Sequence, residues 1–119
     1  TCALPIYYIR GLSLLGGEPM EKVNQIEIVN LLRRVKKELP NKDVWCYSGY
    51  TLDKDILSKT GKVHIDVTDE ILSYIDVLVD GEFVEDLKDL RLKFRVSSNQ
   101  RVIDLKETLK QGKVVKLFD

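Results

Sequence analysis

The chain has 119 residues, of which 44% are hydrophobic, so it is long enough to bury one core and form one globular domain. Its 19 lysines and arginines balance its 19 acidic residues, which gives no overall electrostatic support for binding to nucleic acid or to a membrane. It contains no run of 18 apolar residues and no secretory signal pattern, so we expect a cytoplasmic protein.

The first part of the chain alternates strand and helix patterns. Residues 10–15 are a short apolar run that predicts a buried strand. From Val23 to Leu39 the apolar residues recur at helical spacing, and Pro40 ends the predicted helix. Residues 43–47 predict a second strand. Strand, helix and strand in this order usually give parallel pairing with a right-handed crossover.

The middle of the chain predicts shorter elements. Two short helices are expected, one capped by Thr51 and one capped by Thr68. The continuous apolar run from Ile75 to Asp80 predicts a third strand in a central position, because an exposed edge strand would alternate with polar residues.

The C-terminal part begins with residues 91–95, where apolar and polar positions alternate, followed by a polar block. Asp104 is a suitable cap for a helix that Gly112 ends, and residues 114–118 predict a closing strand. The complete pattern is that of an α/β fold.

A turn of unusual composition, Gly16-Gly17-Glu18-Pro19, follows the first predicted strand. Two glycines let the backbone turn sharply and approach a ligand, and a neighbouring carboxylate can receive an ammonium group. The proline fixes the direction in which the chain leaves. Glycine-rich turns also end many strands for purely structural reasons.

Four segments in this order resemble the anaerobic ribonucleoside-triphosphate reductase-activating proteins, a family of radical S-adenosylmethionine (radical-SAM) enzymes. The segments read RGLSLLGGEP from Arg10, DVWCYSGY from Asp43, DVLVDGEF from Asp76 and SSNQR from Ser97. The resemblance covers residues 7–119 and implies part of an open (β/α) barrel, truncated at its start, with a mostly parallel sheet. Residues 1–6 do not share it, and we expect them to be a non-native or disordered head.

The family's C-x-x-x-C-x-x-C loop, whose three thiolates hold a [4Fe-4S] cluster, is not in this sequence. The chain has two cysteines, Cys2 and Cys46, which are far apart, so they cannot provide three-thiolate ligation. His64 is the single histidine, which excludes a histidine-based metal cluster and disfavours a hydrolase. We therefore assign no metal ligand and no catalytic residue.

The resemblance implies a reaction and its partners. In this family a reduced [4Fe-4S] cluster cleaves S-adenosylmethionine, and the resulting 5′-deoxyadenosyl radical takes a hydrogen atom from a glycine of the reductase, leaving a glycyl radical. The partners are the anaerobic reductase and an electron donor such as flavodoxin. We expect this chain to be inactive by itself because it lacks the cluster ligands. The alternative is a non-catalytic α/β module that retains S-adenosylmethionine binding or reductase binding.

Candidate cofactor-binding residues follow from the rule that ligands bind at the carboxyl ends of parallel strands and, for the late polar block, from its resemblance to the family's motif. For Glu18 the resemblance implies contact with the amino group of S-adenosylmethionine. Ser48 either bonds a ligand carboxylate or ribose or belongs to an ordinary turn, and Asp80 either binds the ligand or ends its strand in an Asp-Gly turn. The late polar block either lines the cofactor site or caps the next helix, and Val96 replaces an expected glycine in it. The full set is Gly16, Gly17, Glu18, Pro19, Ser48, Asp80, Ser98, Asn99 and Gln100.

Overall fold

The computed structural model describes residues 11–14, 18–82, 84–88 and 99–117. The expected head at 1–6 and the alternating pattern at 91–95 lie outside the described residues.

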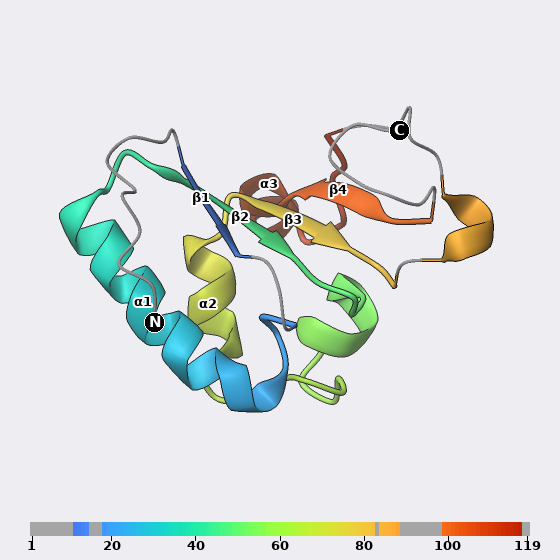
Figure 1. Cartoon of the computed structure of the whole chain (residues 1–119), viewed down its shortest axis with the longest axis horizontal. Helices are drawn as coiled ribbons and strands as arrows, with labels where there is room; N and C mark the ends of the chain where they lie inside the picture. The colour runs from blue at the N-terminus through green and yellow to red at the C-terminus, as the bar shows by residue number, and fades with distance from the viewer. Residues whose placement is uncertain (1–10, 15–17, 83, 89–98, 118–119) are drawn as a thin grey trace.

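The described part is built around one open four-stranded sheet (Figure 1). The strands β1, β2, β3 and β4 lie side by side in chain order, and they span Gly11–Leu14, Asp43–Tyr47, Val77–Asp80 and Arg101–Asp104. The β1–β2 and β2–β3 pairings are parallel, whereas the β3–β4 pairing is antiparallel. The α/β class is confirmed, but the sheet is mixed rather than clearly parallel, because β4 returns directly beside β3.

Helical segments lie between the strands and after β4. They are α1 (Lys22–Glu38), the π-helix η2 (Leu52–Ile56), α2 (Thr68–Tyr74), the 3₁₀-helix η3 (Glu85–Leu87) and α3 (Leu105–Gln111). Figure 1 shows α1, α2 and the green η2 below the sheet, with α3 behind β3 and β4. None of the helices in the described ranges combines the length and the apolar character needed to cross a membrane.

The main core lies between the sheet and these helices. Alternate strand residues point toward α1 and α2, as expected for a sheet with one face buried by helices. On α1 the buried apolar positions Val29, Leu32 and Val35 follow helical spacing. The strand residues that join this core are Leu12, Leu14, Val44, Cys46, Leu78 and Ile103.

The opposite face of the sheet carries a second, smaller apolar cluster. Val77, Val79 and Val102 are buried there, and the partly buried Trp45 and Tyr47 pack against them. The strands β2 and β3 therefore carry apolar side chains on both faces, which fits the central position expected for β3.

Several sequence-based expectations are confirmed. The helix expected from Val23 to Leu39 matches α1 to within one residue at each end, and β2 has the expected bounds. Asp104 caps α3, since its side chain accepts a 3.1 Å hydrogen bond from the Glu107 N–H. Gly112 ends that helix in the left-handed conformation, with φ 73°.

Other expectations were wrong. Thr51 stands at the expected N-cap position of η2 but its side chain makes no cap hydrogen bond, and Thr68 is not a cap but the first residue of α2, with its hydroxyl bonded to Gln25. The expected strand at 114–118 is reduced, in its described part, to a single antiparallel bridge between Lys116 and Ile103. Strand β4 was not expected, because its four residues follow directly on a polar block.

An ion pair joins the exposed surfaces of α1 and α2. The Arg33 guanidinium donates hydrogen bonds of 2.6 and 2.7 Å to the two carboxylate oxygens of Glu70. The Tyr74 hydroxyl donates another, 2.9 Å long. Together, with Arg33 contributing most, these bonds lower the pKa of Glu70 to about 2. The pair adds a surface contact between the two helices.

The loop between η2 and α2 makes a close backbone contact at Gly61. A Cβ atom at this position would lie 2.4 Å from the Asp55 carbonyl oxygen. We therefore expect Gly61→Ala to lower the free energy of unfolding by about 1–3 kcal/mol, because backbone atoms must move apart. Urea unfolding measures this change. Gly49→Ala is the control, since its nearest contact would be an ordinary 3.4 Å. Equal stability of the two variants would contradict the prediction.

Candidate ligand site at the carboxyl ends of the parallel strands

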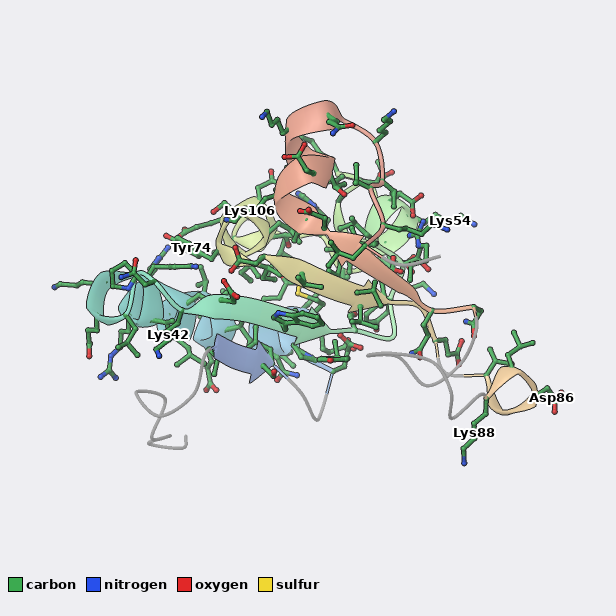
Figure 2. All side chains as sticks on the ribbon, turned by 90° about the horizontal axis from the view of Figure 1, so that it is seen from above. Lys42, Lys54, Tyr74, Asp86, Lys88 and Lys106 are labelled. Carbon is green, nitrogen blue, oxygen red and sulfur yellow. The ribbon has the colours of Figure 1, made fainter. Side chains whose placement is uncertain are left out.

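The carboxyl ends of β1, β2 and β3 meet at one edge of the sheet, where the antiparallel β4 begins. Figure 2 shows Lys54 at this edge, and Lys42 and Tyr74 toward the opposite, amino-terminal edge. Of the expected site residues, Glu18, Pro19, Ser48, Asp80, Asn99 and Gln100 lie within the described ranges. Gly16, Gly17 and Ser98 lie outside them.

Glu18 joins the turn after β1 to the turn after β2. One carboxylate oxygen accepts hydrogen bonds from the Met20 N–H (2.9 Å) and the Ser48 hydroxyl (2.8 Å), and the other accepts from the Gly49 N–H (2.6 Å). A carboxylate has about four acceptor positions, so the three donors found among the described residues leave one position for a further donor. Glu18 is half-buried, and it is therefore held in place while keeping access to a donor such as an ammonium group.

The Ser48 hydroxyl has a defined role in this arrangement. It donates its single hydrogen to Glu18 and accepts a 3.0 Å hydrogen bond from the Tyr50 N–H. Its backbone N–H is bonded to the Val79 carbonyl of β3 at 2.9 Å. Ser48 is buried, so in this structure its hydroxyl orients the Glu18 carboxylate.

Asp80, the last residue of β3, is occupied by protein donors. Its side chain is 1% exposed and forms a two-point ion pair with Arg101, with N–O distances of 2.9 and 2.6 Å. The Leu52 N–H, at the start of η2, donates a third bond of 2.7 Å. Arg101 also reaches Asp53 at 3.0 Å. Hydrogen bonding to Asp80 and then to Asp53 raises the pKa of Arg101.

Asn99 and Gln100 hold the backbone that follows β3. The Asn99 amide donates to the Glu82 carbonyl at 2.8 Å, and the Gln100 amide donates to the Gly81 carbonyl at 3.0 Å. Gly81 has φ 104°, a conformation that favours glycine. The two amides thus fix the turn that Asp80 and Gly81 begin.

The structure brings the described candidates together in two adjacent groups. Glu18 and Ser48 are in direct contact, while Asp80, Asn99 and Gln100 surround the turn at Gly81. The groups are joined through the backbone, because the Gly81 N–H bonds the Tyr50 carbonyl at 3.2 Å. Pro19, the residue after Glu18, is buried. All of these residues lie at the same edge of the sheet.

Sequence reasoning missed the ion pairs of Arg101 with Asp80 and Asp53. The three residues are 21 and 48 positions apart, and no local pattern marks such partners. The available signal was indirect. A buried strand that ends in a carboxylate needs a compensating cation, and Arg101 stands at the end of the late polar motif.

The cysteines do not fit an iron–sulfur cluster. Cys46 lies in the middle of β2, completely buried, with Leu14 and Leu78 as its neighbours in register. Burial raises the pKa of its thiol to about 12, which opposes formation of the thiolate that binds metal. Among the described residues no three histidine, cysteine or acidic side chains are grouped to hold a metal ion.

A mixed sheet with helices on one face defines an α/β domain, and its carboxylates Glu18 and Asp80 lie at the ends of parallel strands, the edge at which sheets of this class generally bind ligands. The chain belongs to the 4Fe-4S single cluster domain family, whose family model matches residues 2–103.

Curated relatives extend this finding. The chain is similar to proteins named anaerobic ribonucleoside-triphosphate reductase-activating protein, which confirms the resemblance carried by the four motifs. Identity is 44% over 92 residues with the protein of Vibrio cholerae, covering 76% of this chain and 53% of that protein. With the Escherichia coli K12 protein it is 40% over 97 residues, covering 82% and 57%. With the phage T4 protein it is 39% over 95 residues, covering 80% and 53%.

The chain spans about half the length of the curated relatives it matches. No solved structure matches it significantly.

Proposed function

We propose that this chain forms the S-adenosylmethionine-binding edge of an activating protein for anaerobic ribonucleoside-triphosphate reductase. The observation that carries the proposal is the Glu18 carboxylate, which Ser48, Gly49 and Met20 fix and which keeps one acceptor position that no donor of the described residues occupies. The names of the relatives supply the reaction context. In this proposal the ammonium group of the methionine moiety binds Glu18, next to the turn expected at Gly16 and Gly17.

The arrangement of helices supports a barrel-like architecture for the proposed protein. In a (β/α) barrel, helices cover the outer face of the strands, while the inner face is lined by side chains. Here α1, α2 and η2 lie on one face, and the other face carries Val77, Val79 and Val102. We propose that these strands are part of an open (β/α) barrel of the radical-SAM type.

The proposed activity is generation of a glycyl radical on the anaerobic reductase in the cytoplasm, with S-adenosylmethionine as the radical source and a donor such as flavodoxin supplying the electron. The residues of this chain would bind and orient the sulfonium nucleoside and exclude water from it. No step is assigned to iron, because the sequence has two cysteines where three thiolates are needed. For the same reason we propose that the chain alone is catalytically silent.

The poor fit to a cluster favours one second candidate, a non-catalytic α/β module that retains S-adenosylmethionine or reductase binding. The two proposals share the ligand site and differ in chemistry. Supplying the chain with reductase, S-adenosylmethionine and a strong reductant under anaerobic conditions tests them. A glycyl radical signal in electron paramagnetic resonance would contradict both the non-catalytic module and the proposed silence of the chain alone, whereas ligand binding without that signal agrees with both.

The site itself is tested by Glu18→Gln. Titration calorimetry with S-adenosylmethionine is expected to show binding to the unaltered chain and dissociation constants about 10–100-fold higher for the variant, because a charge-assisted hydrogen bond is replaced by a neutral one.

Glu21→Gln is the matched control, since its carboxylate accepts from the Tyr50 hydroxyl (2.8 Å) and is not assigned to the ligand. The proposal fails if the unaltered chain does not bind, or if both substitutions have the same effect.

A further inference from the structure

Gln25 is a fully buried polar side chain in the first half of α1, where apolar residues would be expected. Its amide nitrogen donates hydrogen bonds to two backbone carbonyls, those of Met20 (2.8 Å) and Val63 (2.7 Å). Its amide oxygen accepts a 2.6 Å bond from the Thr68 hydroxyl. All its polar atoms are therefore bonded within the protein, which is what makes its burial tolerable.

These bonds join three segments that are distant in sequence. Thr68, at the start of α2, also accepts a 2.8 Å bond from the Ile65 N–H. The network thus connects the turn before α1, the loop at Val63 to Ile65, and α2. Because Gln25 and Thr68 are both completely buried, water cannot replace a lost partner without opening the core.

The network ends at the residue that holds Glu18. Met20 is completely buried; its carbonyl accepts from Gln25, and its N–H donates to the Glu18 carboxylate at 2.9 Å. The same turn is tightened at the Glu18 carbonyl, which accepts from the Glu21 N–H and from the Asn24 amide. The position of the Met20 backbone therefore determines where one donor to Glu18 stands.

We propose that Gln25 is a positioning residue for the ligand-binding carboxylate of Glu18, acting through the backbone of Met20. The inference rests on the proposed function, because it assigns Glu18 to the ammonium group of S-adenosylmethionine. Without the Gln25 amide, the Met20 carbonyl loses its side-chain partner, and the Met20 N–H is held less firmly toward the Glu18 carboxylate. Binding then loses the preorganisation that a fixed carboxylate provides.

The decisive experiment compares two ligands on the full 119-residue chain. S-adenosylmethionine carries the ammonium group, whereas 5′-methylthioadenosine has the same nucleoside without the amino-acid end. In the variant Gln25→Met, methionine has a similar volume to glutamine and cannot form these bonds. We expect its dissociation constant for S-adenosylmethionine to be roughly tenfold higher. Its dissociation constant for methylthioadenosine should change by less than about twofold. A side chain that only supports the fold would weaken both ligands alike.

A second pair of variants covers the case in which Gln25→Met does not fold. Thr68→Val removes the hydroxyl that fixes the Gln25 amide, and Thr68→Ser keeps it. The amide proton of Gly49, bonded to Glu18 at 2.6 Å, provides a ligand-free readout by nuclear magnetic resonance. We expect its resonance to move upfield in Thr68→Val and to stay in place in Thr68→Ser. The affinity for S-adenosylmethionine should likewise fall in Thr68→Val and stay unchanged in Thr68→Ser.

The outcomes separate the inference from the proposed function. If Glu18→Gln weakens S-adenosylmethionine binding while Gln25→Met and Thr68→Val leave it unchanged, the inference is overturned and the proposed function stands. Equal weakening of both ligands also overturns it. If the unaltered chain does not bind S-adenosylmethionine, the proposed function fails and the inference fails with it.

Discussion

Arg101→Met is expected to lower the free energy of unfolding by about 3–5 kcal/mol, since it leaves a buried carboxylate without its cation. Asp80 is 1% exposed, and after the substitution its remaining described donor is the Leu52 N–H. Methionine fills much of the volume of the arginine stem, so the loss measures the missing charge and hydrogen bonds rather than a cavity. Urea unfolding followed by circular dichroism gives the value.

Two further variants identify the cause. Asp53→Asn removes only the exposed arm of the arrangement, since Asp53 is 49% exposed, and we expect less than about 1 kcal/mol. The double variant Asp80→Asn with Arg101→Met removes both charges and should be more stable than Arg101→Met alone. An Arg101→Met protein as stable as Asp53→Asn would show that the ion pair does not hold this edge of the sheet.

Anaerobic reconstitution of the chain with iron and sulfide is expected to yield no stoichiometric four-iron cluster. The sequence contains two cysteines, and Cys46 is completely buried with its pKa raised by burial to about 12. Three thiolates, which the family's cluster needs, are not available. Iron analysis and absorbance in the visible range measure the outcome.

Cys46→Ala provides the control for this experiment, because its iron content should equal that of the unaltered chain. Reaction of Cys46 with a thiol reagent should also be slow in buffer and fast in urea, since the thiol becomes accessible only on unfolding. A stable cluster with four irons per chain would contradict the expected lack of a cluster.

The elements that the sequence predicted well are those with a strong local signal. Apolar spacing alone was enough for α1, and a carboxylate followed by a glycine eight residues later placed both ends of α3. The parallel pairing of β1, β2 and β3 follows from the alternation of strands and helices. These features depend on residues close together in the chain, so one sequence contains them.

The features that the sequence did not predict depend on partners far along the chain. Thr68 has the sequence environment of a helix cap, but its hydroxyl donates to Gln25, 43 residues earlier. Strand β4 became a strand by pairing with β3, and its polar end residue Arg101 finds Asp80 only through that pairing. For the site, the sequence placed Glu18 and Ser48 at neighbouring strand ends, but it did not indicate that one hydrogen-bonds the other.

The carboxylate at the end of β3 also constrains the order of folding. The first N–H of η2, at Leu52, has its acceptor on Asp80, 28 residues later in the chain. During synthesis residues 52–56 therefore leave the ribosome before Asp80 has been made. Asp80 in turn gains its cationic partner only when Arg101 has been made. We therefore expect this turn of helix to become stable only after β3 has paired with β4, as a late folding unit, although it stands near the middle of the polypeptide.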